Sequence, residues 1–188
     1  MTLEFADKSN IYIRSGNLYV IPRLADNAAA SPTDFSAITT PLATFDTNTG
    51  ITIKKELEKQ IFEGMDEDIA LASKVKYIID GVVGEIMNEL IAMMTGQNPD
   101  TAGVLDTTTE TGYEIVDLWS PAEIAEFAIK IEGLDPNGKE VGYIFHNCTF
   151  DATELPPFKG KEKPAWAITI TADMNAGGSP GYSYLKVA

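Results

Sequence analysis

Residues 128–145 read AIKIEGLDPNGKEVGYIF, two alternating segments on either side of a turn. Apolar residues recur at every second position before the turn, as at Ile129 and Ile131, and after it, as at Val141 and Tyr143. This period of two is the pattern of half-buried strands. The intervening Asp-Pro-Asn-Gly suits a type I turn, because proline presets the first central φ and glycine tolerates the positive φ that follows. The stretch therefore predicts an antiparallel β-hairpin.

The same alternation recurs along most of the chain and predicts a mainly β protein. Further strands are expected at Leu18–Ile21, Val75–Ile79, Tyr113–Trp119 and Trp166–Thr171. With 188 residues, 44% of them hydrophobic, the chain is long enough to bury a core without disulfides or a metal. We therefore expect one domain that spans residues 1–188.

The segment Ile51–Phe62 predicts a long strand with one apolar and one polar face. Ile53 and Leu57 share one face, while Glu56 and Glu58 lie on the opposite face. A helix is the competing interpretation, because lysine and glutamate favour helices over strands. We expect the strand.

One helix and two long loops interrupt the strands. Apolar residues at helical spacing predict the helix from about Gly84 to Thr95, and Gly96 ends it. The loops, residues 24–44 and 97–112, are rich in small and polar residues and lack a period. Loops of this length usually have a function, so we expect both to contact another chain and to become ordered on assembly. Their candidate contact residues are Phe35, Ile38, Leu42, Val104 and Leu105.

The charged and metal-binding residues argue against several classes of function. The 14 Lys and Arg against 28 Asp and Glu give a formal net charge of −14, so a groove that grips DNA phosphates is not expected. Cys148, the single cysteine, forms no internal disulfide, and His146, the single histidine, cannot supply the nitrogen ligands of most catalytic zinc sites.

The chain starts without the pattern of a secretory signal and contains no membrane-spanning apolar run, so we expect a protein made in the cytoplasm.

Two motifs that suggest chemistry have simpler structural interpretations. Residues 133–139, GLDPNGK, approach a phosphate-binding loop, but Glu140 stands where a serine or threonine would hold magnesium, and a strand follows where a helix is required. His146 and Cys148 lie two apart and would share one strand face as a base and a thiol, but no third group positions them. We expect a hairpin turn, a half-buried strand, no cofactor and no enzymatic activity.

The order of these segments resembles that of the tail tube, or major tail, proteins of long-tailed, non-contractile bacteriophages. The hairpin at Ala128–Phe145 is the strongest part of the resemblance, and the long insertion at 97–119 departs from the simplest pattern. The other segments that carry it are the GNLYVIP strand (Gly16–Pro22), a Pro-Thr-Asp loop (Pro32–Asp34), the Gly-Ile-Thr-Ile segment with its Glu-rich strand (Gly50–Glu58), the strand and helix at Lys74–Gly96, and the strand Ala167–Met174.

This resemblance implies an antiparallel β-sandwich or rolled barrel with one flanking α-helix and long assembly loops. It also implies a virion protein whose copies form hexameric rings, which stack into a tube through which DNA passes without specific binding. A tape measure protein and a tail terminator would be further partners, with no membrane. Six copies of a −14 chain carry −84 formal charges, and an acidic conduit repels phosphates. The candidate lumen-facing acids are Glu56, Glu58, Asp66, Glu67 and Asp68.

Three other functions stay open at the level of sequence, and the least favoured is an enzyme with scattered carboxylates, because no nucleophile, base and orienting group stand together. A tail terminator or distal-tail protein of related fold would form a single ring in place of a tube. A β-sandwich module that binds glycans would use Trp119, Trp166 and Tyr113 as an aromatic platform.

Overall fold

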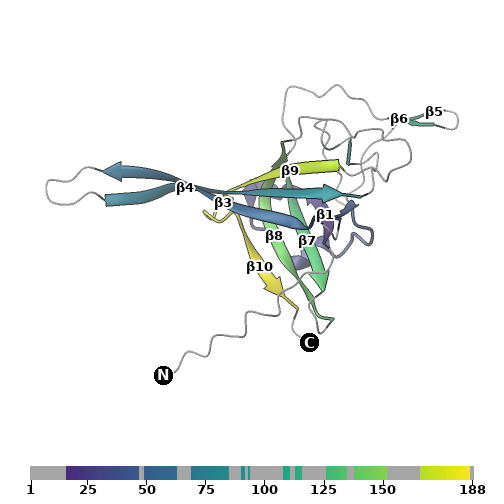
Figure 1. Cartoon of the computed structure of the whole chain (residues 1–188), viewed down its shortest axis with the longest axis horizontal. Helices are drawn as coiled ribbons and strands as arrows, with labels where there is room; N and C mark the ends of the chain where they lie inside the picture. The colour runs from purple at the N-terminus through teal and green to yellow at the C-terminus, as the bar shows by residue number, and fades with distance from the viewer. Residues whose placement is uncertain are drawn as a thin grey trace.

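The predicted fold class is confirmed by the arrangement of the strands. The computed structural model describes residues 16–46, 49–62, 69–84, 90–91, 93, 108–110, 113–115, 126–134, 138–151 and 166–186. In this part of the chain the structure is mainly β, with one eight-stranded antiparallel sheet and a separate two-stranded hairpin (Figure 1).

The large sheet has the strand order β2-β1-β7-β8-β9-β4-β3, and β10 pairs with the same edge of β8 as β9 does. Its strands are β1 (Asn17–Pro22), β2 (Ala43–Thr44), β3 (Ile51–Phe62), β4 (Ile69–Val83), β7 (Phe127–Leu134), β8 (Glu140–Phe150), β9 (Trp166–Asp173) and β10 (Gly181–Leu185). The separate hairpin consists of β5 (Thr108–Glu110) and β6 (Tyr113–Ile115). Two short 3₁₀ helices, η2 (Ala25–Asn27) and η3 (Pro32–Phe35), lie between β1 and β2.

The β7–β8 hairpin is the one that residues 128–145 predict. Its register places Ile131 opposite Tyr143 and Leu134 opposite Glu140. Gly138 has a φ of 77°, a conformation that glycine adopts without strain; residues 135–137 of the turn lie outside the described residues. Because β8 continues from Glu140 as a strand, the turn does not open a helix of the kind that a phosphate-binding loop requires.

The sheet curls around one large apolar core, here called the central cluster. Just beyond β2, Phe45 pairs with Val83 of β4, and the Asp46 N–H donates to the Val82 carbonyl at 2.7 Å. These bonds join the segment after β2 to the end of β4. The core takes its side chains from β1, from the segment after β2, and from β4, β7, β8 and β9. The largest of them are Leu18, Phe45, Ile79, Phe127, Ile129, Ile131, Phe145, Trp166, Ile168 and Ile170.

The predicted helix contributes to this core. Leu90, Ile91 and Met93 are helical, and Leu90 and Met93 are buried in the central cluster. Gly84, where the helix was expected to begin, is instead a bend directly after β4. Helical conformation is therefore confirmed at three positions, and the bounds of the helix lie outside the described residues.

The middle of the 24–44 loop, with Ala30, Phe35 and Ile38, packs on the opposite face of β1, β7 and β8, whereas its end forms β2 in the sheet. There Ala30 and Phe35 are buried against residues of these strands and form a second core, the outer cluster, which consists of Ile21, Ala30, Phe35, Ala128 and Ile144. The expectation that this loop becomes ordered only on assembly stays a prediction, but the buried Ala30 and Phe35 give the loop contacts within its own subunit. Two apolar side chains, placed over a sheet face that is itself apolar, anchor the loop within its own subunit.

The second predicted loop, 97–112, ends in a strand. Thr108–Glu110 forms β5 and pairs with β6, so Thr109 lies opposite Glu114. The threonine run favours this outcome, because β-branched residues suit extended backbone. Val104 and Leu105, the candidate contact residues of this loop, lie outside the described residues.

Candidate assembly surface

The β3–β4 hairpin extends beyond the rest of the sheet as a two-stranded arm (Figure 1). On β4, only residues Tyr77–Val83 pair with β9. The remaining part, Glu56–Phe62 on β3 and Ile69–Lys76 on β4, pairs only with itself, and no described strand pairs with the outer edge of β3. At about 3.4 Å per residue this arm projects on the order of 25 Å. An isolated two-stranded hairpin is marginally stable in water, so the arm is expected to gain stability from a neighbour.

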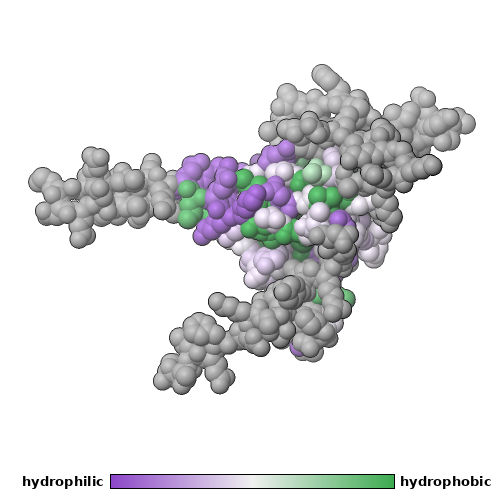
Figure 2. All heavy atoms as spheres, in the orientation of Figure 1, coloured by the Kyte–Doolittle hydropathy of each residue, from purple (hydrophilic) through white to green (hydrophobic). Residues whose placement is uncertain are grey.

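The outer face at the base of the arm carries ion pairs between neighbouring strands. Lys54 Nζ lies 2.8 Å from Asp80 Oδ2, and Lys76 Nζ lies 3.1 Å from Glu56 Oε2. Lys74 Nζ reaches Asp173 of β9 at 3.0 Å. Hydrophilic residues accordingly cover this region (Figure 2). We call this surface the charge ladder.

The pKa values of the charge ladder respond to these pairs. A hydrogen bond from Lys54, a second one from Thr169 at 3.0 Å and the charge of Lys54 hold the pKa of Asp80 below its ordinary value, although partial burial opposes them. The hydrogen bond and charge of Glu56 raise the pKa of Lys76. Both shifts favour the charged forms, so the ladder stays ionised at neutral pH.

The predicted lumen-facing acids are only partly described. Glu56 and Glu58 are exposed on the polar face, as expected, but Glu56 is paired with Lys76, and Glu58 lies opposite Lys74. This face is therefore a mixed array of both charges, because cross-strand neighbours of opposite charge attract. Asp66, Glu67 and Asp68 lie outside the described residues.

The other face of the arm carries an apolar pair that the sequence prediction did not single out. Leu57 lies opposite Val75, on the same face as the core residue Ile79 and as Ile53, which packs against the core. Leu57 is 45% exposed, because it lies in the part of the arm that extends beyond the pairing with β9. The alternation in Ile51–Phe62 places Leu57 on the apolar face of the strand. Only the pairing of β4 with β9, which stops at Tyr77, shows that this face extends beyond the core.

The candidate residues of the 24–44 loop lie against the body of the subunit. Phe35 is 1% exposed and packs in the outer cluster of its own subunit, and its expected contact with another chain stays a prediction. Ile38 packs on the outer cluster and Leu42 on the central cluster, both partly buried. Their apolar character serves the subunit's own cores.

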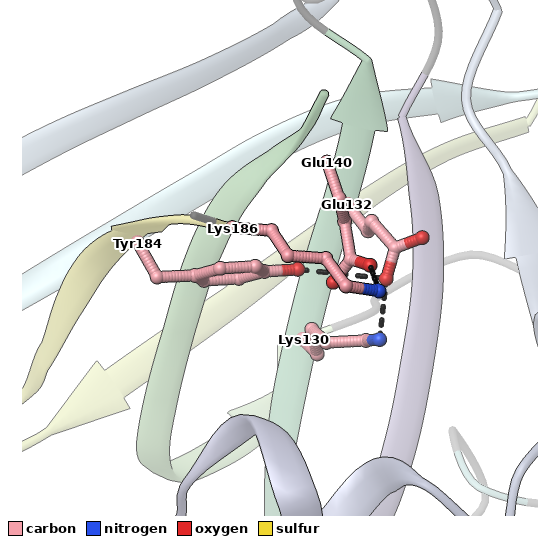
Figure 3. Close-up of polar contacts among 5 residues, drawn as sticks. All are labelled: Lys130, Glu132, Glu140, Tyr184 and Lys186. Atoms are coloured by element: carbon pink, nitrogen blue, oxygen red, sulfur yellow. Dashed lines mark hydrogen bonds and ion pairs between the residues drawn. The ribbon is translucent and has the colours of Figure 1, made fainter. Parts of the chain in front are cut away.

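A network of charged and phenolic side chains joins β10 to the β7–β8 hairpin (Figure 3). Lys130 pairs with Glu132, and the Tyr184 hydroxyl lies 3.5 Å from Glu132 Oε2. Lys186 Nζ lies 3.1 Å from Glu140 Oε2, and the Lys186 N–H donates to the Glu140 carbonyl at 2.9 Å. The members come from three strands, so the network fixes β10 in place.

This network shifts the pKa values of its members in opposite directions. Burial raises the pKa of Glu140, but the hydrogen bond from Lys186 and the charges of Lys130 and Lys186 outweigh it, so the pKa is lowered. Burial and the charges of Glu132 and Glu140 raise the pKa of Tyr184. The phenol therefore remains a hydrogen-bond donor to the carboxylates.

His146 and Cys148 do not form a base and thiol pair. The register between β7 and β8 shifts between Phe127 and Ile129, opposite this part of β8. As a result Cys148 lies in the central cluster, whereas His146 faces the loop residue Ala30 on the opposite side of the sheet. Burial raises the pKa of the Cys148 thiol well above its ordinary value, so the thiol is unreactive in the folded chain.

The aromatic platform expected for a glycan-binding module is also not formed as predicted. Trp166 is 2% exposed in the central cluster. Trp119 lies outside the described residues, and Tyr113 begins β6. A platform needs exposed rings, and burial removes Trp166 from it.

Neither a metal site, nor a membrane-spanning helix, nor a known relative suggests another function for the described part of the chain. Among the described residues, no group of three or more histidine, cysteine or acidic side chains is arranged to hold a metal ion, and no helix is long and apolar enough to span a membrane. Comparison with known proteins finds no matching family model and no matching curated protein.

Proposed function

We propose that this chain is a structural subunit of a bacteriophage tail tube. Its copies assemble into rings, six to a ring, and the rings stack into a conduit for DNA in the virion tail. The proposal rests on the resemblance of the ordered segments from Gly16 to Met174 and on a mainly β fold with a projecting arm. The tape measure protein and the tail terminator are the proposed partners at the inside and the end of the tube.

The projecting β3–β4 arm is the observation that carries this proposal. Among the described strands, the part of the arm beyond Tyr77 pairs only with itself, and its apolar face exposes Leu57. A long, partly apolar edge left open in a free subunit is a liability that monomeric proteins usually protect. An arm of this kind is useful where a neighbouring copy covers it, because each added copy then buries one arm and offers another.

The charge distribution suits a conduit. The formal net charge is −14, and in the described part of the chain Lys54, Lys74, Lys76, Lys130 and Lys186 each pair with a carboxylate. Paired lysines release few counterions to a phosphate backbone. DNA would therefore slide past these surfaces without being held.

An arm variant tests this function. Leu57→Asp places a charge on the exposed apolar face of the arm and should change the stability of the subunit by no more than about 0.5 kcal/mol, because the site is exposed. We expect it to reduce assembly in sedimentation velocity at least tenfold relative to the wild type. Leu134→Asp, at the end of β7 where Leu134 is 54% exposed, is the matched control and should assemble normally.

Assembly of Leu57→Asp at the wild-type level would contradict the role of the arm. Equal loss of assembly in Leu57→Asp and Leu134→Asp would show that any exposed charge has this effect and would remove the support for a specific contact. Single rings without stacking would favour a tail terminator or a distal-tail protein.

A further inference from the structure

One residue of the 24–44 loop is held by two long-range hydrogen bonds. The Ala30 N–H donates to Nδ1 of His146 on β8 at 3.0 Å. The Ala30 carbonyl accepts from the hydroxyl of Tyr182 on β10 at 3.0 Å. The two rings also contact each other, with their centroids 5.5 Å apart. Ala30, His146 and Tyr182 together form a node that joins the loop to two strands.

The hydrogen bond from Ala30 defines the protonation state of His146. A nitrogen that accepts a hydrogen bond carries no proton, so the ring is neutral with its proton on Nε2. His146 is 1% exposed, and burial lowers its pKa. A proton added to Nδ1 would point at the Ala30 N–H, and the bond would be replaced by a repulsive contact between two donors.

The charged groups near the node do not replace this bond. On the loop side, Asp34 accepts hydrogen bonds from the Ser31 N–H and hydroxyl, both at 2.7 Å. On β10, burial and the charge of Asp34 raise the pKa of Tyr182, so its phenol stays protonated. On β7, Lys130 lies on the same face of the sheet and is paired with Glu132. A protonated His146 would therefore be buried, and none of the described carboxylates would pair with it.

The loop covers apolar surface that its release would expose. Phe35 and Ala30 cover Ile21, Ala128 and Ile144 in the outer cluster. The start of the loop is fastened separately, since the Asn27 carbonyl accepts from the Ala176 N–H at 3.0 Å. The η3 turn has its own capping box between Ser31 and Asp34, so residues 28–38 can leave the sheet as a unit with Asn27 as one fixed end.

We propose that the Ala30–His146–Tyr182 node is an acid-sensitive latch: protonation of His146 releases residues 28–38 from the sheet and exposes the apolar face beneath them. When residues 28–38 cover the sheet, they keep water away from the imidazole. When they leave, water can hydrate the charged imidazolium. This device is independent of the proposed tail-tube function, and it would operate in the isolated subunit.

The wild-type protein tests the latch directly, because it contains a single histidine. Nitrogen-15 labelling of histidine gives one imidazole whose titration reports the pKa of His146. Hydrogen exchange of residues 28–38, corrected for the intrinsic effect of pH, reports release. We expect a pKa below 6.5 and a loss of protection of about tenfold per pH unit below 6.5, since only the open form then binds the proton. An ordinary pKa, or protection that does not change between pH 7.5 and pH 5, would overturn the proposal.

Two variants separate the latch from general acid instability. His146→Asn places an amide oxygen near the position of Nδ1 and does not titrate, so residues 28–38 should stay protected at pH 5. Loss of protection equal to that of the wild type would overturn the proposal. Tyr182→Phe keeps the imidazole but removes the second bond to Ala30, so release should begin at a higher pH. An unchanged midpoint in Tyr182→Phe would contradict the node, whether or not His146→Asn folds.

Discussion

Glu56 and Lys76 lie directly opposite each other on β3 and β4, and their side chains form an ion pair of 3.1 Å. This pair changes what the acidic residues of the arm can do. A carboxylate that is neutralised by a neighbour in its own subunit repels passing phosphates less than an isolated one. In the proposed tube, the negative potential would therefore depend on the surplus of acids over the whole chain more than on Glu56 alone.

Reversal of the acids on the arm should create a basic row. Glu56→Lys together with Glu58→Lys would add two cations beside Lys74 and Lys76, and in a tube whose lumen this face lines, DNA release should slow. The effect should weaken with added salt, because the Debye length is about 8 Å at physiological ionic strength. Ejection rates measured by light scattering test this. Glu56→Gln with Glu58→Gln is the control, and normal ejection by the lysine variant would show that this face is not luminal.

The subunit should show no measurable affinity for duplex DNA at physiological salt. Its net charge is −14, and the described lysines of the charge ladder and of the β10 network are paired with acids. Sequence-independent binding depends on unpaired cations that release counterions. An electrophoretic mobility shift that titrates with protein and weakens steeply with salt would contradict this prediction.

Gly142 should not tolerate a side chain. A Cβ at this position would lie 2.0 Å from the Ile131 carbonyl oxygen and 3.1 Å from the Tyr184 ring. Gly142→Ala should therefore lower the free energy of unfolding by about 1–3 kcal/mol, the cost of an overpacked site. Urea denaturation measures the change. Gly84→Ala is the matched control, because among the described residues no atom beyond the chain neighbours lies within 4 Å of a Cβ placed there; similar destabilisation of both variants would show that the contact at Gly142 is unimportant.

Acid should destabilise the base of the arm through Asp80. The pKa of Asp80 is lowered in the folded chain by Lys54 and Thr169, so its stabilising effect is present above the ordinary value of 3.8 and is lost as pH falls through the folded pKa. Asp80→Asn should melt at a lower temperature than the wild type at pH 6, and this difference should shrink towards pH 2. Thermal melts across this range measure it. A difference that does not depend on pH would contradict a role for the ionised carboxylate.

The strands could be predicted from the sequence because their side chains alternate. Which strands pair with each other could not be predicted. The period of two defines β3, the β7–β8 hairpin and β9 without any knowledge of the fold. The order of the strands, and with it the projecting arm, depends on pairings between residues far apart in sequence. The bond between Ala30 and His146 spans 116 residues, and no local pattern indicates it.

Two features that the sequence did not indicate have a common physical cause. The 24–44 loop looks polar on average, but two of its buried residues, Ala30 and Phe35, lie over an apolar sheet face. His146 and Cys148 are two apart and would share a face in a regular strand, but the irregular register between β7 and β8 places them on opposite faces. Composition averages and strict alternation both miss such single-residue effects.

Electron microscopy of the purified full-length protein, imaged over a range of concentrations, tests the central claim most directly. The proposal predicts hollow tubes of constant width that are built from stacked rings, together with shorter stacks at low concentration. Leu57→Asp should give fewer tubes under the same conditions. Monomers alone at every concentration and salt condition, or isolated rings that never stack, would contradict the assignment as a tail tube subunit.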